Sequence, residues 1–342
     1  MRIAVLEAVC AGLCGENPPP SLLAEGLAMW RALIEDLLLN PQVTIETVVD
    51  DRWFAMTPSL SRVHAWRVSD VRESMTCWQN CLDDTEATWI IAPECDALLQ
   101  QLVEMLPPSH RSWNASPEAI ALCADKLALA QHLARHSVAT IPTVSETWQS
   151  PPHFDEDSKF VIKPRDGAGS QLVRRIADQA AWKKTRQEYR ASGDPPAIRQ
   201  PFIPGTPLSI AGWFDRNGVQ WFPVAEQVLG EDFVYCGGVI AARVDDEAHA
   251  TVQRLVTVAV ATIPGLQGYI GFDVLLPERT PDTPVLVEIN PRLTTSCLGI
   301  RRLCRGNWLA SLMADPSKPL EWHTDRRIEF TSQAVVREVP LS

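Results

Sequence analysis

The sequence predicts an α/β fold, in the broad sense that includes α+β arrangements, and the first part of the chain carries the clearest sign of it. Short apolar segments alternate with helical patterns over about residues 2–106, as they do when strands are buried in a parallel sheet. Beyond residue 160, strand patterns instead meet at turn sequences, which indicates antiparallel hairpins. With 46% hydrophobic and 21% charged residues, the 342-residue chain can bury a sizeable core in one large domain or two to three smaller ones.

The N-terminal unit is expected to alternate strand and helix. In order, we predict a strand over residues 2–9, a helix over 21–39, a strand over 43–49, a strand over 87–92 and, after Pro93-Glu94, a helix to about Leu106. The strands are short apolar runs, which suits strands that are covered on both faces. Ser21 is a good helix cap, and the leucines after it form a wide apolar face. We expect this unit to be a domain over residues 1–112.

The rest of the chain is expected to form a second domain over residues 113–315, divided into subdomains 113–200 and 201–315, with a C-terminal tail over 316–342. Its predicted helices cover 117–135, 177–189, 247–263 and 301–313, and its predicted strands cover 160–162, 197–202, 208–214, 221–228, 269–276, 285–289 and 332–336. Asn217-Gly218 supplies the positive φ angles of a tight turn between two of these strands. A proline-rich turn over 277–284 joins the last long hairpin.

Charge and composition exclude several classes of function. The chain has 31 Lys and Arg residues against 42 Asp and Glu residues, a formal net charge of −11, so it offers no basic face for nucleic acid or for an anionic membrane. No apolar run reaches the roughly 18 residues of a membrane helix, and Glu7 interrupts the apolar core that a signal peptide needs. We expect a cytoplasmic protein without a nucleic-acid or membrane partner. Its assembly stays open, a homodimer being one option.

A glycine-rich segment follows the predicted strand over 160–162. It reads Lys163, Pro164, Arg165, Asp166, Gly167, Ala168, Gly169 and Ser170. Two glycines separated by one small residue let backbone N–H groups converge on an anion, and the ammonium group of Lys163 can neutralise a phosphate. The segment matches neither the P-loop nor the Rossmann pattern. Phosphate binding and a plain turn between two strands are therefore both open on these residues alone.

Polar side chains interrupt the last predicted hairpin. Glu288 and Asn290 lie two residues apart on one strand, so their side chains share a face. Asp273 on the partner strand can join that face across an antiparallel pair. Two carboxylates and an amide oxygen make a hard-oxygen site for Mg²⁺, which bridges nucleotide phosphates. The alternative, a polar strand face in contact with solvent, fits less well because the strand is otherwise apolar.

Four motifs in a fixed order carry a family resemblance. They are Lys163 with its glycine loop, Gln200-Pro201-Phe202-Ile203-Pro204-Gly205, Gly271-Phe272-Asp273 and Glu288-Ile289-Asn290-Pro291-Arg292. Together they resemble the ATP-grasp superfamily over about residues 110–310, and the N-terminal unit is similar to the pre-ATP-grasp domain that usually precedes that fold. Residues 25–29, 235–238 and 288–296 further resemble the tyramine–glutamate ligases of methanofuran-type cofactor synthesis and their bacterial relatives.

The resemblance implies an ATP site with roles for individual residues. Lys126 and Lys163 match the lysines that reach the nucleotide phosphates, and Asp166, Gly167, Ala168, Gly169 and Ser170 match the loop beside them. Gln200, Pro201, Phe202 and Ile203 match the hinge that holds adenine. Asp273, Glu288 and Asn290 match the ligands of Mg²⁺, for which Mn²⁺ is a substitute. Arg292, together with Lys163, matches the groups that act on the reacting phosphoryl group.

Two positions depart from the family pattern. Gln200 stands where the hinge commonly carries an acid, so it can donate or accept a hydrogen bond but has no charge. The segment over 205–209 lacks the glutamate that often contacts ribose. The resemblance therefore leaves the ribose contact undefined, while the phosphate and metal residues match the pattern.

The resemblance also implies an ADP-forming carbon–nitrogen ligase. ATP would phosphorylate a small-molecule carboxylate, and an amine would then displace phosphate to form an amide. Glutamate with a phenolic amine such as tyramine is one such pair, in cofactor biosynthesis. Two alternatives stay open: a ligase that adds glutamate or another amino acid to a peptide or cofactor tail, and a catalytically silent nucleotide-binding regulator. Thr294, Thr295 and Ser296 either lie near the substrate carboxylate or cap a helix.

Overall fold

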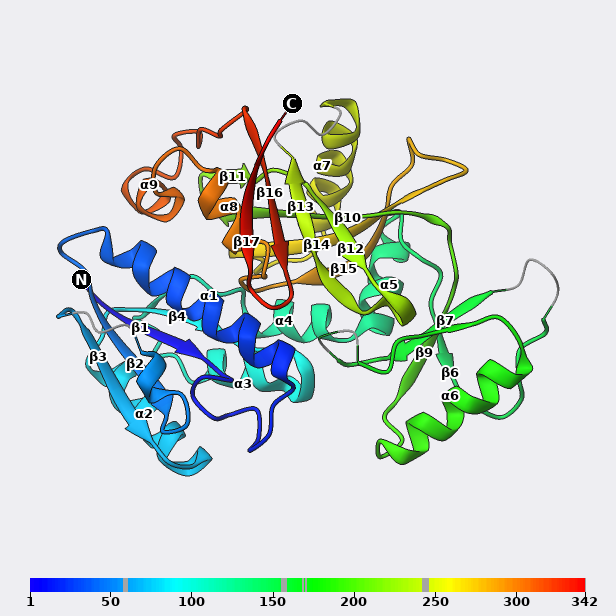
Figure 1. Cartoon of the computed structure of the whole chain (residues 1–342), viewed down its shortest axis with the longest axis horizontal. Coiled ribbons are helices and arrows are strands. Elements are labelled where there is room, and N and C mark those ends of the chain that lie inside the picture. The colour runs from blue at the N-terminus through cyan, green and yellow to red at the C-terminus, as the bar shows by residue number, and fades with distance from the viewer. Residues whose placement is uncertain (58–60, 155–158, 168, 170, 242–245, 342) are drawn as a thin grey trace.

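The computed structural model describes residues 1–57, 61–154, 159–167, 169, 171–241 and 246–341, which form three β-sheets with helices packed around them (Figure 1). A five-stranded sheet belongs to the N-terminal part of the chain, a four-stranded sheet to the middle, and an eight-stranded sheet to the C-terminal part. The fold is therefore mixed α/β, as the sequence predicts. No helix in the described part of the chain combines the length and apolar character needed to cross a bilayer.

The N-terminal domain is a parallel sheet with the strand order β3-β2-β1-β4-β5. Its strands are β1 Arg2–Glu7, β2 Thr44–Asp50, β3 Val63–Val68, β4 Ala87–Ile91 and β5 Arg111–Ser112, and its helices are α1 Pro20–Leu38, α2 Val71–Asp83 and α3 Leu98–Glu104. The predicted strands and the long first helix are confirmed. Strand β3 and helix α2 were not predicted. Strand β3 is a half-exposed edge strand in which His64 and Arg67 interrupt the apolar residues without a regular alternation, so its local signal is weak.

The prediction of a single helix over 117–135 is wrong in one respect, because the structure has two helices there. They are α4 Pro117–Ala124 and α5 Lys126–Arg135. Between them, Asp125 has an extended backbone with ψ 95°, and its side chain accepts hydrogen bonds from the backbone N–H groups of Leu127 and Ala128. Asp125 therefore acts as the N-cap of α5. The break places Lys126 in the first turn of the second helix.

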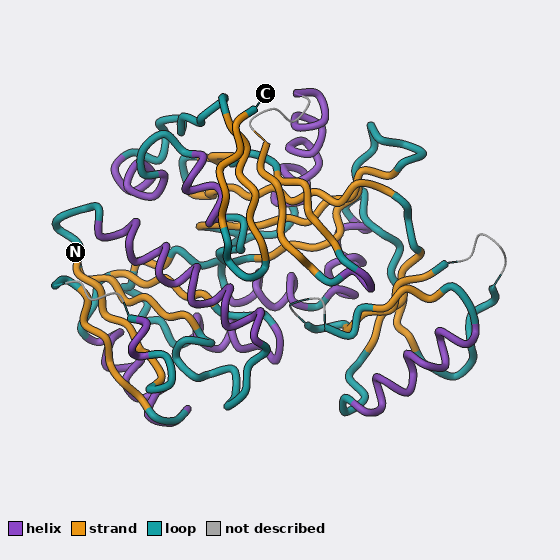
Figure 2. The backbone as a smooth tube through the Cα atoms, viewed as in Figure 1, coloured by secondary structure: helices purple, strands orange, loops and turns teal. Residues whose placement is uncertain are grey.

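The middle sheet is antiparallel, with the strand order β6-β9-β7-β8. Its strands are β6 Val144–Glu146, β7 Phe160–Pro164, β8 Arg174–Ile176 and β9 Ala197–Pro201, and helix α6 Gln179–Ala191 packs beside them (Figure 2). The buried rings of Trp182 and Tyr189 on α6 contact Ile162 and Ile176 of the sheet, forming a small separate core. Lys163 lies on β7, next to Ile162, at the edge of this core.

The C-terminal sheet has the order β15-β14-β10-β12-β13-β16-β17, with β11 paired to β10. Its strands are β10 Gly205–Asp215, β11 Gly218–Trp221, β12 Ala225–Leu229, β13 Tyr235–Ala241, β14 Gly268–Pro277, β15 Val285–Asn290, β16 Arg326–Thr331 and β17 Val336–Pro340, and its helices are α7 Asp246–Ala261, α8 Cys297–Leu303 and α9 Trp308–Ala314. Short 3-10 helices elsewhere cover Phe54–Met56, Cys95–Ala97 and Glu231–Phe233. The hairpin predicted over 269–289 is confirmed as β14 and β15.

Three predictions in this region are wrong in detail. The helix expected over 301–313 is two helices, α8 and α9, and the strand expected over 221–228 is split into the end of β11 and the strand β12. The strand expected over 332–336 is mostly the turn between β16 and β17, where Ala334 has a φ of 61°. Residues 316–342, expected as a tail, thus contribute two strands to the eight-stranded sheet, because β16 pairs with β13.

The N-terminal domain packs against the C-terminal part of the chain through aromatic rings and a buried ion pair. The ring centroid of Trp89 on β4 lies 5.5 Å from that of Trp213 on β10 and 6.5 Å from that of Trp308 on α9. Beside them, the buried carboxylate of Asp36 on α1 pairs with Arg301 on α8 at 2.7 Å and accepts a hydrogen bond from Trp308 Nε1 at 3.0 Å. These contacts fix the position of the N-terminal sheet relative to the large sheet.

The Asp36 contact gives a stability prediction. Asp36→Ala should lower the free energy of unfolding by about 3 kcal/mol, because it leaves the buried indole of Trp308 without its acceptor and leaves Arg301 with only its exposed partner Glu35. The control is Glu35→Gln, which removes a 51%-exposed partner of the same arginine and should cost less than about 1 kcal/mol. Urea unfolding followed by tryptophan fluorescence measures both. Equal losses in the two variants would contradict this account.

Candidate active site

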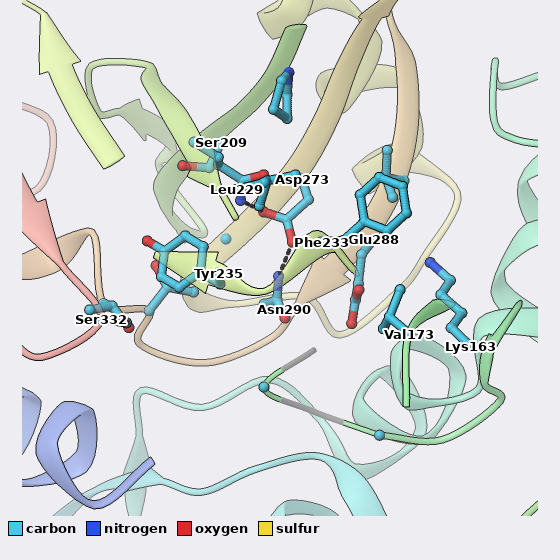
Figure 3. Close-up of a pocket in the computed structure, with 18 of the residues that line it drawn as sticks. Lys163, Val173, Ser209, Leu229, Phe233, Tyr235, Asp273, Glu288, Asn290 and Ser332 are labelled. Atoms are coloured by element: carbon cyan, nitrogen blue, oxygen red, sulfur yellow. Dashed lines mark hydrogen bonds between the residues drawn. The ribbon is translucent and has the colours of Figure 1, made fainter. Parts of the chain in front are cut away.

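A cavity of about 510 Å³ lies where the three parts of the chain meet. Most of the site residues predicted from the sequence line it, and they come from the middle sheet, the C-terminal sheet, the segments that follow their strands, and helix α5. These residues are Lys126, Lys163, Gly167, Gly169, Gln200, Pro201, Phe202, Ile203, Asp273, Glu288, Asn290 and Arg292. Asp166 does not line the cavity, and Ala168 and Ser170 lie outside the described residues. Figure 3 shows one part of the cavity, with Asp273, Glu288, Asn290 and Lys163 drawn as sticks.

Strands β14 and β15 bring the three predicted metal-ligating residues onto one face. Asp273 lies directly opposite Glu288 in the antiparallel register, and Asn290 lies opposite Gly271. Asn290 Nδ2 donates to Asp273 Oδ2 at 3.2 Å, which Figure 3 marks with a dashed line. Gln227 Nε2 on β12 donates to the other Asp273 oxygen at 2.8 Å. The sequence prediction that these polar side chains converge is therefore confirmed, and Gln227 is an addition that only the sheet order shows.

The two carboxylates of this face titrate differently because their neighbours differ. Burial, together with the negative charge of Glu288, raises the pKa of Asp273 to about 7. Burial acts in the same direction on Glu288, but the ammonium groups of Lys126 and Lys163 outweigh it and lower the pKa of that carboxyl. Like charges facing each other in a buried site favour a cation between them. Glu288 therefore stays ionised, whereas burial and the charge of Glu288 favour the protonated form of Asp273.

Two lysines approach this face from other parts of the chain. Lys126, in the first turn of α5, lies 3.3 Å from Glu288 Oε1 and donates a hydrogen bond to the backbone carbonyl of Gly167 at 2.8 Å. Lys163 on β7 is 7% exposed, and in Figure 3 its side chain lies beside that of Glu288. Burial lowers the pKa of Lys163, whereas the pKa of Lys126 is raised because the nearby Glu288 outweighs its burial. Both lysines belong to the same charged cluster.

The glycine loop is attached to helix α5 and to the N-terminal domain. Lys126 donates its backbone N–H to the carbonyl of Arg165 at 3.1 Å, and Arg165 Nε donates to Asp125 Oδ1 at 2.8 Å. Asp166 is exposed and accepts a hydrogen bond from the backbone N–H of Asp96 at 2.9 Å, so its side chain is directed away from the cavity. Among the described loop residues, the glycines Gly167 and Gly169 are the ones that face the cavity.

The predicted hinge lies at the end of β9, between the middle and C-terminal sheets. Gln200 is buried, and its Nε2 donates to Thr143 Oγ1 at 2.8 Å, so the residue that replaces the usual acid has a neutral hydroxyl partner. Phe202 donates its backbone N–H to the carbonyl of Lys159 at 2.8 Å. In the segment over 205–209, Pro207 and Ser209 line the cavity. The wall beside the hinge is otherwise apolar, with Val173 and Leu229 among its residues (Figure 3).

Arg292 follows β15 and has a partner that sequence reasoning missed. Its Nε donates to Glu94 Oε2 at 2.9 Å, although the two residues are 198 positions apart. Glu94 lies just beyond the carboxyl end of β4, in the N-terminal domain. The sequence offered one signal for Glu94, its position directly after a buried strand of a parallel sheet, because ligand sites lie at the carboxyl ends of such strands. The negative charge of Glu94 outweighs burial and raises the pKa of Arg292.

Further carboxylates and hydroxyl groups, from β1, α1 and the segment after β15, also line the cavity. Glu7, at the end of β1, is 2% exposed and accepts a hydrogen bond from the backbone N–H of Cys10 at 2.7 Å. Glu25 on α1 accepts from the hydroxyl of Thr295. Burial raises the pKa of both carboxyls. Neither forms an ion pair with a residue that the structure describes.

Hydroxyl groups near Arg292 bond to one another. Ser296 occupies the N-cap position of α8 but makes no side-chain capping bond. Its hydroxyl instead lies 2.9 Å from that of Thr294 and 3.3 Å from that of Tyr269. Thr295 bonds to Glu25, so the helix-capping alternative for these three hydroxyl residues is wrong, and all of them line the cavity.

The residues of the hairpin face fit a divalent ion such as Mg²⁺. Asp273, Glu288 and Asn290 supply carboxylate and amide oxygens, the donor set that Mg²⁺ prefers. In the described part of the chain, no cluster of three or more His, Cys, Asp or Glu residues is arranged to hold a metal ion. The set on β14 and β15 has two such residues, and the amide oxygen of Asn290 completes a hard-oxygen set of the predicted kind.

Comparison with known proteins supports the same domain arrangement. The model of the ATP-grasp domain matches residues 123–296, and the model of the pre-ATP-grasp domain, type 3, matches residues 43–120. A tyramine–L-glutamate ligase of Methanocaldococcus fervens is 26% identical over 215 residues, which cover 62% of this chain and 60% of that relative. The alignment thus spans about three fifths of the relative's length.

Solved structures show the same fold. An Archaeoglobus fulgidus structure assigned to the ATP-grasp superfamily has a TM-score of 0.74 at 24% identity, with 100% of both chains covered. An L-amino acid ligase from Bacillus licheniformis has a TM-score of 0.65 at 14% identity, covering 96% of this chain and 78% of that one. Because the ATP-grasp model matches slightly more than half of the residues, and the fold agrees, the chain belongs to the ATP-grasp superfamily of ligases.

Proposed function

We propose that the protein is an ATP-dependent carboxylate–amine ligase that forms an amide through an acyl phosphate. The observation that carries the proposal is the division of charge in one cavity. Lys126 and Lys163 lie beside the hairpin face of Asp273, Glu288 and Asn290 (Figure 3), whereas Glu7 and Glu25 line the same cavity without an ion pair to a described residue. The lysines and the hairpin face suit a nucleoside triphosphate with its cation, and the two glutamates suit a cationic amine.

The reaction needs charge neutralisation more than a nucleophilic side chain. A substrate carboxylate oxygen attacks the γ-phosphorus of ATP, the bond between that phosphorus and the β–γ bridging oxygen breaks, and ADP leaves. The amine nitrogen then attacks the acyl carbon, phosphate leaves, and the nitrogen loses its proton. Lys126 and Lys163 offset the phosphate charge, and Arg292 offsets the charge of the acyl phosphate.

Asp273, Glu288 and Asn290 would hold Mg²⁺. The ion, when bound, supplies positive charge that reduces the repulsion between the anionic carboxylate and ATP. Lys126 pairs with Glu288 at 3.3 Å, so it limits the net negative charge that the chain itself places at this face. The backbone of the hinge over 200–203, together with the apolar wall, would hold the adenine ring.

Glutamate and a phenolic amine such as tyramine are the substrate pair we propose. The cavity also has apolar and aromatic lining, including Tyr235 and, on the same helix as Glu25, Met29. A buried carboxylate without a cation partner is stabilised by an ammonium group, and the apolar lining suits an aromatic body. The matched relative is named for the same pair. Stepwise addition of amino acids to a cofactor tail is the alternative.

An ADP-release screen tests the proposed function. Amino acids are combined with aromatic amines in the presence of ATP and Mg²⁺, and products are identified by mass spectrometry. We expect ADP release that depends on both substrates, with one amide product of a single mass. A ladder of masses spaced by one amino-acid residue would favour the stepwise alternative. Nucleotide binding without ADP release for any pair would contradict the ligase proposal and favour a regulator.

Glu288→Gln should reduce kcat at least about 100-fold while leaving the fold intact. The substitution removes a negative charge that faces Asp273 and leaves Lys126 without its acidic partner. Removing one group that stabilises charge in a transition state typically lowers kcat by about 10²- to 10³-fold. The measurement is ADP release with far-UV circular dichroism as a check of folding. Glu226→Gln on the exposed side of β12 is the control. Near-parental activity of Glu288→Gln would refute the metal assignment.

Lys163→Ala should weaken nucleotide binding roughly 10- to 100-fold, because a charge-assisted hydrogen bond is worth about 1.5–3 kcal/mol. Lys163 is only 7% exposed, so a lysine from the protein surface cannot readily replace its ammonium group in the variant. Calorimetry with a non-hydrolysable ATP analogue and Mg²⁺ measures the change. Lys183→Ala, on the exposed side of α6, should bind like the parent. If both variants bind alike, Lys163 does not contact the phosphates.

Glu25→Gln should raise the KM for tyramine about tenfold or more and leave the KM for ATP within about twofold, because the carboxylate lines the cavity but is not paired with either phosphate-binding lysine. Steady-state kinetics with each substrate varied in turn separates the two values. Glu35→Gln is a matched control on the same helix, since Glu35 pairs with Arg301 instead. A parallel rise in both KM values would exclude Glu25 from amine recognition.

A further inference from the structure

Glu94 and Arg292 form an ion pair that crosses from the N-terminal domain to the ATP-grasp domain. The Nε–Oε2 distance is 2.9 Å, and the side chains are 10% and 17% exposed. Arg292 Nη1 donates to the carbonyl of Leu293 at 3.3 Å, whereas no hydrogen bond joins Nη2 to a described residue. Arg292 lines the cavity. The two contacts therefore fix the plane of the guanidinium and leave one nitrogen for a ligand.

One of the two carboxylate oxygens of Glu94 lacks a hydrogen-bond partner in the described part of the chain. Its second oxygen, Oε1, is buried and has no hydrogen-bond partner among the described residues. An unpaired buried carboxylate oxygen destabilises a folded protein, so stability alone does not explain a glutamate here. The contact that Glu94 does make is the one to Arg292.

Arg292 has other carboxylates within electrostatic range. Glu25 and Glu288 both raise its pKa, and Arg292 in turn lowers the pKa of Glu7 against the larger effect of burial. A long arginine side chain with several acidic neighbours can adopt several pairings. The Glu94 contact selects one of them, because it is the only acidic side chain in the described part of the chain that lies within ion-pair distance of Arg292.

We infer that Glu94 is a positioning residue: it holds Arg292 by Nε so that the free Nη2 points to the transferring phosphoryl group. The inference rests on the proposed ligase function. It assigns the N-terminal domain a part in phosphoryl transfer, in addition to lining the cavity. The expected signature is a defect in the transition state for phosphoryl transfer with little change in the binding of ADP.

The test compares Glu94→Ala and Glu94→Gln with the parent chain. Calorimetry measures the affinity for MgADP and for MgADP with aluminium fluoride, which mimics the transferring phosphoryl group. We expect the parent to bind the fluoride complex at least about tenfold more tightly than MgADP, and Glu94→Ala to lose that gain while keeping its MgADP affinity. Glu94→Gln keeps an acceptor for Nε and should recover part of the gain.

A matched control separates positioning from loss of structure. Asp36→Asn also removes a buried charge that pairs an arginine across the same domain boundary, but Asp36 does not line the cavity. Asp36→Asn should lower the melting temperature but still bind MgADP with aluminium fluoride more tightly than MgADP alone, as the parent does. If Glu94→Ala and Asp36→Asn lose the gain equally, Glu94 has only a structural role and the inference is wrong.

A double-mutant cycle shows whether Glu94 acts through Arg292. Glu94→Ala should have no further effect in an Arg292→Ala background, because the group that it positions is absent. Additive effects would overturn the inference. A parent chain that binds MgADP equally with and without aluminium fluoride would overturn it as well. A parent chain that shows the fluoride gain but forms no amide contradicts the proposed substrates and leaves the role of Glu94 supported.

Discussion

Two carboxylates that face each other in a buried hairpin are the constraint on which the site depends. Asp273 and Glu288 are held in register by β14 and β15, where neither can move away from the other. Burial and their repulsion raise the pKa of Asp273, and the lysines from α5 and β7 keep Glu288 ionised. The charge is balanced only when α5 and β7 are in place beside the hairpin, so the fold and the site depend on each other.

The cavity has contributions from every sheet, so groups of opposite charge reach it from different parts of the chain. The middle sheet and α5 bring the cations Lys163 and Lys126, and the N-terminal domain brings Glu7 and Glu25 and, through Glu94, a partner for Arg292. The aromatic contact of Trp89 with Trp213 and Trp308 holds the N-terminal domain against the C-terminal part. The N-terminal domain is therefore part of the site and not only a neighbour of it.

Much of the site could be predicted from the sequence because it consists of local patterns. The alternation of Glu288 and Asn290 on one strand, the glycines after Lys163 and the order of the motifs are all readable along the chain. The division of the helix at Asp125, the edge strand β3 and the last hairpin were missed, because a capping aspartate, a half-exposed strand and a turn of non-glycine residues give weak local signals.

The sequence by itself determined the fold class, the hairpin and which residue types stand in the cavity. Only the tertiary structure decided their partners: Gln227 for Asp273, Glu94 for Arg292, Thr295 for Glu25, and the direction of Asp166 away from the cavity. The physical reason is distance along the chain. Periodicity and propensity act over a few neighbouring residues, whereas these charges are paired by strand order and domain packing across tens to hundreds of positions.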